Sequence, residues 1–469
     1  MTGDDLQVAP AGVSWTEAEV CTALGLPAPT ASLSFSGITT DSRAVKPGAL
    51  FVALVGERFD GHDYLSAVAA AGATGAVVRQ GTTPVPGLRL FTIPDTLVAL
   101  GDLARARRRR IAGPVVAITG TNGKTSTKEM LAAVLGTRYR VHATRANLNN
   151  LIGVPLTILE APADIEALVV EAGASVPGEI ARARRIIEPD IVVLTNAVAG
   201  HLEGFGSLAG VIEEKLSISD GIALAIVGPE PPELAAGARQ RARRVLTAGL
   251  RGADLVPERA VVGQDARPVM TIGGQTFTLA ARGLHQADNA VRVWAVVEAL
   301  RLDPVAAGQA LEHFTIPGGR GELMQIGGLT ILNDCYNANP QSFRAAIETA
   351  KSLRGNRRLV FLAGTMRELG SEAETLHRDI ARGLVELEPA LLGAVGEFVP
   401  ALEPYRATLG DRLVTAPDPI ALGERIAGRL EGTEVIVLKA SRGVALERIL
   451  PALTAQAHPA AGDARHRSR

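Results

Sequence analysis

Residues 119–125 combine two glycines, a lysine and three hydroxyl side chains in the order Thr-Gly-Thr-Asn-Gly-Lys-Thr. They follow the apolar run Val115–Thr119 and precede a predicted helix beginning near Lys124. In that context, backbone N–H groups and a helix N-terminus bind phosphate. We expect Lys124 to reach the β- and γ-phosphates of a nucleotide and the Thr125 hydroxyl to bind Mg²⁺. The residues expected to bind the phosphates are Gly120, Thr121, Asn122, Gly123, Lys124, Thr125 and Ser126.

The two glycines are closer together than in the common P-loop pattern, which has four residues between them. Only Thr121 and Asn122 separate Gly120 from Gly123. A plain strand–helix turn is the alternative interpretation of this segment. The strand, the glycines, the lysine and the threonine in register favour a phosphate loop of a less common type.

Three further side chains follow the predicted strands. Glu171 comes directly after the apolar run 167–170, and His201 follows 190–195 across a glycine-containing turn. Because parallel strands end at one sheet edge, both could ligate a metal near the phosphates. Glu171 could equally be a solvated strand-end carboxylate, and His201 could be structural or exposed. The local sequence around Lys215 predicts a solvated lysine on a helix.

Short apolar strands alternate with helical stretches in much of the chain, which predicts an α/β protein with parallel sheets covered on both faces. We expect a small α/β domain over 1–112, a P-loop-like ATP-binding domain over 113–315, and a Rossmann-like domain over 316–469. Residues 314–321 form a glycine-rich linker that would permit domain closure. The predicted strands are 50–54, 75–78, 115–119, 167–170, 190–195, 222–227, 330–333, 359–364, 392–395 and 434–439.

Helix starts are also marked by local signals. Asn339 followed by Pro340 predicts an N-cap and first turn. Ser371 and Glu374 have the spacing of a capping box. Residues 105–110, five of which are arginine, lie at the end of a predicted helix and are expected to be a solvated helix end.

The composition excludes several classes of protein. The 469 residues carry 48 Lys+Arg against 49 Asp+Glu, so no overall basic field favours nucleic acid or anionic lipid. Cys21 and Cys335 have neither disulfide-framework nor zinc-type spacing. No apolar run approaches the ~20 residues that span a bilayer, and no apolar signal region follows the N-terminus. A cytoplasmic protein is expected.

Through these motifs the chain resembles the Mur ligases of bacterial cell-wall synthesis, and the match runs through nearly the whole sequence in order. The segments Asn-Leu-Asn-Asn, His-Leu-Glu-Gly-Phe-Gly and Tyr-Asn-Ala-Asn-Pro are typical of members that add D-alanyl-D-alanine to UDP-N-acetylmuramoyl-tripeptide. The resembling segments are 39–43, 119–125, 147–155, 171–173, 195–196, 201–206, 319–321, 334–340 and 439–443.

The resemblance implies an ATP-dependent ligase of peptidoglycan synthesis that forms an amide bond through an acyl phosphate. Its partners would be UDP-N-acetylmuramoyl-tripeptide and D-alanyl-D-alanine, with ATP and two Mg²⁺ ions, and its products the pentapeptide, ADP and phosphate. A monomer without nucleic-acid or membrane partners is expected. The implied substrate contacts are Ser42 and Arg43 for UDP, Asn147, Asn149 and Asn150 for the muramoyl-peptide, and Asn337 and Asn339 for the dipeptide.

The resemblance also implies roles in catalysis and nucleotide binding. Thr125 and Glu171 would hold one Mg²⁺, and Glu171, His201 and Lys215 the second, with Lys215 carbamylated. CO₂ addition makes this ligation chemically reasonable, because an ammonium cannot bind Mg²⁺ whereas a carbamate oxygen can. The implied catalytic residues are Lys124, His201, Lys215 and Arg320; the implied adenine, γ-phosphate and ribose contacts are Asn289, Arg320 and Asp334, respectively.

The chain departs from the family pattern at three places. Gln286 stands where asparagine is more frequent, Thr365 stands where aspartate is usual, and residues 227–230 lack an Asn-Asp pair. These positions bear on the base contacts and on one wall of the dipeptide site.

Two other functions are compatible with parts of this pattern. A related ligase that adds one amino acid, to a muramoyl peptide or to folate, is disfavoured by the segment 336–340. A nucleotide-binding regulatory or scaffolding protein with a decayed site is disfavoured by the intact set of Lys124, Thr125, Glu171, His201 and Lys215.

Overall fold

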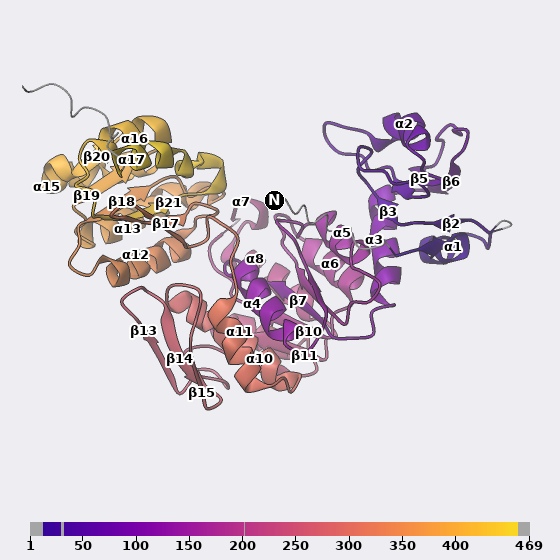
Figure 1. Ribbon diagram of the computed structural model, residues 1–469, viewed down its shortest axis with the longest axis horizontal. Helices are drawn as coiled ribbons and strands as arrows, with labels where there is room; N and C mark the ends of the chain where they lie inside the picture. Colours follow the sequence, from indigo (N-terminus) through magenta and orange to yellow (C-terminus); the bar gives the residue numbers. More distant parts are fainter. Residues whose placement is uncertain (1–12, 30–31, 201, 458–469) are drawn as a thin grey trace, which may run out of the picture.

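The computed structural model describes residues 13–29, 32–200 and 202–457, arranged as three α/β bodies that follow one another along the chain (Figure 1). His201 lies outside the described residues. The N-terminal body contains a parallel sheet in the order β3-β4-β5-β6 and a small antiparallel pair, β1 and β2. Their bounds are β1 Trp15–Thr16, β2 Ser34–Phe35, β3 Ile38–Thr39, β4 Leu50–Val52, β5 Gly75–Arg79 and β6 Arg89–Ile93, with helices α1 Glu17–Leu24, α2 Leu65–Ala70 and α3 Thr96–Arg108.

Helix α3 leaves the first body and packs against the second, on α5 Gly153–Leu159 and α6 Glu179–Ile187. The expectation of a fully solvated arginine run at its end is therefore wrong. Arg107 and Arg108 are buried and donate hydrogen bonds to backbone carbonyls, Arg107 to Pro162 and Arg108 to Ile187. These contacts anchor the helix on the central body.

The central body is built on a parallel sheet in the order β12-β11-β10-β7-β9-β8. Alternate strand residues face two separate cores, since Val116 and Ile118 pack with α4 and α10 while Val115 and Ala117 pack with α5 and α6. The strands are β7 Val115–Thr119, β8 Val141–Ala143, β9 Ala167–Glu171, β10 Ile191–Leu194, β11 Leu224–Val227 and β12 Val245–Thr247. The other helices are α4 Lys124–Gly136, α7 Leu202–Phe205, α8 Leu208–Leu216, α9 Pro232–Arg239, α10 Leu284–Ala299 and α11 Pro304–His313.

A three-stranded antiparallel meander was not predicted. It comprises β13 Arg259–Val262, β14 Pro268–Ile272 and β15 Gln275–Thr278. It packs against α10 and α11.

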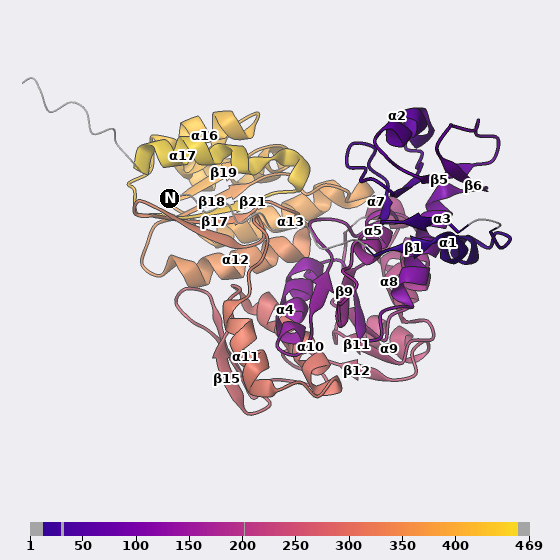
Figure 2. The same cartoon turned by 45° about the vertical axis from the view of Figure 1, so that its right-hand side comes forward.

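The C-terminal body carries a sheet in the order β16-β17-β21-β18-β19-β20, parallel except for β16. Helices α12 and α13 lie on one side of the sheet and α16 and α17 on the other (Figure 2). The strands are β16 Glu322–Ile326, β17 Leu329–Asp334, β18 Leu359–Ala363, β19 Leu391–Ala394, β20 Leu413–Thr415 and β21 Val435–Lys439. The helices are α12 Pro340–Arg354, α13 Ala373–Glu386, α14 Phe398–Leu402, α15 Arg406–Leu409, α16 Pro419–Ala427 and α17 Leu450–Ala457.

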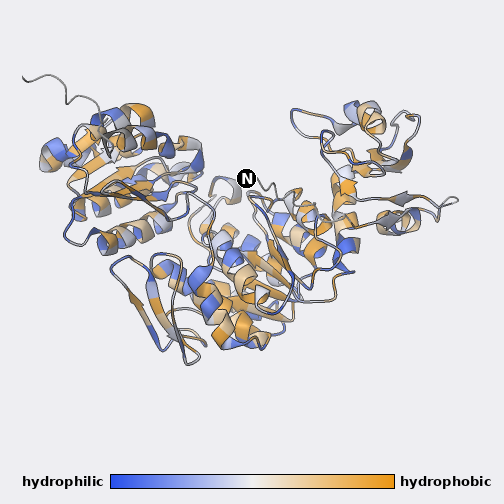
Figure 3. Ribbon diagram, viewed as in Figure 1, coloured by the Kyte–Doolittle hydropathy of each residue, from blue (hydrophilic) through white to orange (hydrophobic). Residues whose placement is uncertain are grey.

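The predicted α/β class with parallel sheets is confirmed, and hydrophobic residues follow the strands of the two larger sheets (Figure 3). The predicted cap at Asn339 is also confirmed, in a capping box with Ser342. The capping box predicted at Ser371 and Glu374 is wrong, because a 3-10 turn, Gly370–Glu372, takes up Ser371 and α13 begins without a side-chain cap. Within the described ranges, no helix is both long and apolar enough to cross a bilayer.

Candidate active site

The loop between β7 and α4 is tightly enclosed. Gly120 and Gly123 have φ angles of +146° and +79°, and a Cβ on Gly120 would lie 2.0 Å from Thr195 Oγ1. The end of β10 holds the loop, because Thr195 Oγ1 donates to the Asn122 carbonyl at 2.6 Å and Asn196 Oδ1 accepts from the Asn122 N–H at 2.9 Å. These contacts fix the shape of the loop backbone.

Lys124 is the first residue of α4 and supplies a cation within this loop. Its Nζ donates to the carbonyl oxygens of Gly120 and Thr121 at 2.8 and 3.0 Å. Burial lowers the pKa of Lys124, the Glu171 carboxylate opposes that effect, and the nearby Arg320 cation lowers the pKa further. Two cations and one carboxylate therefore face the same space, which suits an anion with a bound metal.

Glu171 is the last residue of β9 and is only 2% exposed, so it is not a solvated strand-end carboxylate. Thr125 Oγ1 donates to Glu171 Oε2 at 2.9 Å, and Asn149 Nδ2 donates to Oε1 at 2.8 Å. A hydroxyl and a carboxylate are hard oxygen donors of the kind that bind Mg²⁺, which usually keeps several waters and substrate oxygens. The pair fits such an ion. Among the described residues no group of three His, Cys, Asp or Glu side chains could hold a metal.

Lys215, on α8, is also only 2% exposed, contrary to the solvated interpretation of its own segment. Its Nζ lies 5.5 Å from the centre of the Phe205 ring. Burial lowers its pKa to about 7, and the charge of Lys124 acts in the same direction, while Glu214 and Glu179 oppose it. A substantial fraction of this amine is therefore neutral near pH 7.

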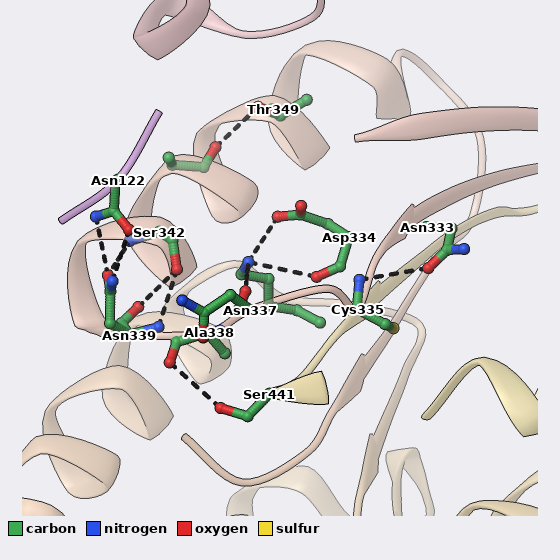
Figure 4. A network of polar contacts seen from close by, with 12 residues as sticks. Asn122, Asn333, Asp334, Cys335, Asn337, Ala338, Asn339, Ser342, Thr349 and Ser441 are labelled. Atoms are coloured by element: carbon green, nitrogen blue, oxygen red, sulfur yellow. Dashed lines mark hydrogen bonds and ion pairs between the residues drawn. The ribbon is translucent and has the colours of Figure 1, made fainter. Parts of the chain in front are cut away.

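The C-terminal body provides the opposite wall. The buried Lys439, at the end of β21, pairs with Asp334 Oδ2 at 2.8 Å and donates to the Asn337 carbonyl at 2.6 Å. Asp334 and Asn337 are labelled in the polar network of Figure 4. Next to them the Arg320 guanidinium stacks 3.4 Å above the Tyr336 ring. The segment after β17 is thereby fixed.

The two bodies touch at the phosphate loop. Asn122 Nδ2 donates to Asn339 Oδ1 at 3.1 Å, and Asn339 Nδ2 donates back to Asn122 Oδ1 at 2.6 Å (Figure 4). Asn122 Nδ2 also donates to Gln341 Oε1 at 2.7 Å. Asn339 caps α12 at the same time.

A cavity of about 520 Å³ opens between the central and C-terminal bodies. Many of the predicted residues line it. They are Thr121, Asn122, Gly123, Lys124, Thr125, Ser126, Asn149, Asn150, Glu171, Asn289, Arg320, Asp334 and Asn337. Gly120, Asn147, Lys215 and Asn339 are not among the lining residues.

Ser42 and Arg43 lie in the N-terminal body, on the loop after β3, and do not line this cavity. The exposed Arg43 pairs with Asp41 at 2.8 Å, and hydrogen bonds from Arg43 lower the pKa of Asp41 to about 2. A ligand touching both this loop and the cavity must bridge two bodies.

At the end of the cavity near α10, side chains form a connected chain. Gln286 Nε2 donates to Ser126 Oγ at 3.3 Å, and Gln286 Oε1 accepts from Asn289 Nδ2 at 3.2 Å. Gln286 thus links the phosphate loop to Asn289. Thr365, the other departure, lies outside the cavity lining, and its hydroxyl accepts from the Glu397 N–H at 3.0 Å.

Sequence reasoning assigned no role to several residues that line the cavity, among them His285, Tyr336 and Lys439. Burial lowers the pKa of His285. Two signals marked Lys439, its place at the end of an otherwise apolar strand and its place in the resembling segment 439–443, and Tyr336 stood within the resembling segment 334–340.

Comparison with known proteins adds to this geometry. Three family models match the chain: the Mur ligase family catalytic domain over 34–108, the Mur ligase middle domain over 118–297, and the Mur ligase glutamate ligase domain over 319–442. A UDP-N-acetylmuramoyl-tripeptide–D-alanyl-D-alanine ligase of Bacillus subtilis is 35% identical over 431 residues, covering 88% of this chain and 92% of the relative.

Two solved structures are similar over most of their length. A MurF from Acinetobacter baumannii has a TM-score of 0.84 at 28% identity, covering 95% of this chain and 99% of the other. A MurF ligase from Thermotoga maritima, in complex with ADP, has a TM-score of 0.80 at 27% identity, covering 90% and 98%.

Proposed function

The chain belongs to the Mur ligase family, and from that premise we propose that it joins D-alanyl-D-alanine to UDP-N-acetylmuramoyl-tripeptide with ATP. The products are UDP-N-acetylmuramoyl-pentapeptide, ADP and phosphate, in peptidoglycan synthesis. The observation that carries the proposal is the cavity in which the phosphate loop and Glu171 face Arg320 and Asp334 of another body. The similarity to the D-alanyl-D-alanine-adding ligases covers nearly the whole chain. It favours D-alanyl-D-alanine over a single amino acid as the amine substrate.

The reaction has two steps. An oxygen of the tripeptide carboxylate attacks the γ-phosphorus of ATP in line, the bond to the bridging oxygen breaks, and ADP leaves. The α-amine of D-alanyl-D-alanine then attacks the carbonyl carbon of the acyl phosphate, the amine loses a proton, and phosphate leaves. Most of the catalytic work is orientation of three substrates.

The residues of the chain supply charge and position. The backbone of residues 120–126 cradles the phosphates, and Lys124 and Arg320 flank the group that transfers, where cations stabilise developing negative charge. Thr125 and Glu171 would hold one Mg²⁺, and Glu171, His201 and Lys215 a second. Bound magnesium supplies neutralisation of phosphate charge. The lowered pKa of Lys215 supports carbamylation, since only the neutral amine adds CO₂.

Substrate contacts follow the three bodies. In this proposal residues 1–112 bind the UDP end through Ser42 and Arg43, 113–315 bind ATP, and 316–469 complete the site. The muramoyl-peptide is approached by Asn147, Asn149 and Asn150. Among these three residues, Asn149 contacts Glu171.

In the rest of the site Asn289 lies on the adenine side, Asp334 on the ribose side, and Asn337 and Asn339 near the incoming dipeptide. We further propose a cytoplasmic monomer.

Phosphate release tests the function. The purified chain with ATP and Mg²⁺ should release phosphate only when UDP-N-acetylmuramoyl-tripeptide and D-alanyl-D-alanine are both present, and mass spectrometry should find the pentapeptide. D-alanine or L-glutamate replacing the dipeptide is the control for a ligase that adds one amino acid. Release that needs neither substrate, or that accepts the single amino acid equally well, contradicts the proposal.

A further inference from the structure

Arg320 lies in a segment that gives it little support of its own. It is flanked by Gly319 and Gly321, whose φ angles of +76° and +72° lie in the left-handed region, and it precedes β16. The two glycines give the backbone many accessible conformations, and the arginine side chain has many rotamers. Both freedoms must be lost before the guanidinium can meet a ligand in one geometry. Its proximity to Lys124 adds repulsion, which favours movement of the guanidinium toward solvent.

Tyr336 restrains both the side chain and the backbone of this segment. The Arg320 guanidinium carbon lies 3.4 Å from the centre of the Tyr336 ring, well inside the ~6 Å range of favourable cation–π contact. The Tyr336 N–H donates to the Gly319 carbonyl at 2.9 Å, so the peptide preceding Arg320 is held by the same residue.

Tyr336 itself stands on a rigid base. On its N-terminal side, Lys439 Nζ contacts Asp334 at the carboxylate (2.8 Å) and at the carbonyl (3.3 Å). On its C-terminal side, the same Nζ bonds the Asn337 carbonyl at 2.6 Å. One buried cation at the end of β21 therefore fixes the chain on both sides of the tyrosine.

We propose that Tyr336 is a positioning residue that holds Arg320 over the phosphate loop, in the orientation that meets the terminal phosphate of ATP. This inference rests on the proposed use of ATP and adds to it the residue through which the arginine acts. Tyr336 need not touch the nucleotide. Its effect should be confined to the ligand that carries a γ-phosphate, because ADP offers Arg320 nothing at that position.

Nucleotide binding, measured without UDP-N-acetylmuramoyl-tripeptide and D-alanyl-D-alanine, isolates this effect. Affinities can be measured by calorimetry with ADP and with the non-hydrolysable β,γ-imido analogue of ATP. Tyr336→Leu should weaken binding of the analogue about three- to tenfold and leave the ADP affinity unchanged. Tyr336→Phe retains the ring and should keep the wild-type preference. In the Arg320→Ala background, Tyr336→Leu should have no further effect.

Tyr139→Leu is the matched control, since Tyr139 is a half-buried tyrosine under Arg138, at 5.2 Å, and does not line the cavity. If Tyr336→Leu does not fold, Tyr336→Met, which also lacks a ring, replaces it in the same cycle. Equal weakening of both nucleotides, additive effects with Arg320→Ala, or a Phe variant as impaired as Leu would each overturn the proposal. If the chain used an amine substrate other than D-alanyl-D-alanine, these titrations would not change. If the wild-type chain failed to bind the analogue, the use of ATP itself would be refuted.

Discussion

Asn122 and Asn339 exchange two side-chain amide hydrogen bonds, although they are 217 positions apart in the sequence. Asn122 belongs to the phosphate loop, and Asn339 is the N-cap of α12 in the C-terminal body. Their contact makes the conformation of the loop depend on the docking of that body, and the reverse also holds because the coupling of two equilibria is reciprocal.

The first prediction separates this contact from helix capping. Asn339→Ser keeps an N-cap hydroxyl but is too short to reach Asn122, so we expect kcat to fall about fivefold to thirtyfold, the effect of roughly 1–2 kcal/mol of lost hydrogen bonding. The melting temperature should change little. Asn339→Ala should lower both kcat and the melting temperature, and Asn122→Ala, which also loses the bond to Gln341, should lower kcat at least as far as the serine variant. Phosphate release and scanning calorimetry measure the two effects, and an unchanged kcat in Asn339→Ser would remove the contact from the mechanism.

The second prediction concerns the carboxylate shared by Thr125 and Asn149. Glu171→Gln keeps the shape and the burial but removes the charge, and we expect kcat/KM to fall about 100-fold or more with a higher Mg²⁺ concentration needed for half-maximal rate. Thr125→Ser retains the hydroxyl and should remain close to wild type, whereas Thr125→Val should resemble Glu171→Gln. A magnesium titration of phosphate release distinguishes these outcomes. Wild-type magnesium dependence in Glu171→Gln would refute the assignment of a metal to this pair.

The third prediction tests the cation in the loop. Lys124→Met removes the amine that bonds the Gly120 and Thr121 carbonyls and should weaken binding of ATP roughly 10- to 100-fold, with turnover reduced further. Lys46→Met, at an exposed lysine of the N-terminal body, is the control. Calorimetry with the β,γ-imido analogue measures the affinity. If both affinity and turnover survive in Lys124→Met, the phosphate site has been misplaced.

Local features could be predicted from the sequence because neighbouring residues determine them. The apolar run Val115–Thr119, the glycines after it and the Asn339–Pro340 cap each specify their own conformation, and each is found as expected. The α/β class follows from repetition of such units. The capping box expected at Ser371 was wrong because an adjoining 3-10 turn competed for the same residues.

Burial and side-chain contacts that depend on the packing of other elements could not be predicted in this way. Lys215 and Arg107 lie in segments that predict solvated side chains, yet both are buried, and Arg107 bonds the carbonyl of Pro162 from a distant part of the chain. The exchange between Asn122 and Asn339 joins two separate sections of the chain, and the stack of Arg320 on Tyr336 joins two loops of one section; no sequence periodicity indicates either contact. The family resemblance indicated their importance but not their contacts.

The last prediction follows from the burial of Lys215. Its pKa is lowered to about 7 from an ordinary value of 10.5, so between these pH values the unfolded chain binds more protons than the folded one. Stability must therefore rise as pH increases through that window, and the cost of the buried charge is greatest at and below about pH 7. Lys215→Met abolishes this cost. In CO₂-free buffer the variant should melt above wild type at pH 7, and the difference should shrink toward pH 10.

Bicarbonate separates this linkage from carbamylation. CO₂ addition consumes the neutral amine and replaces a destabilising buried cation with an anion beside Lys124, so bicarbonate should raise the melting temperature of wild type and leave Lys215→Met unchanged. Intact-protein mass spectrometry under non-acidic conditions should find the added CO₂ on wild type alone. A melting difference that is independent of pH would show that Lys215 is already paired in the folded chain, and a bicarbonate response shared by both proteins would place the effect at another site.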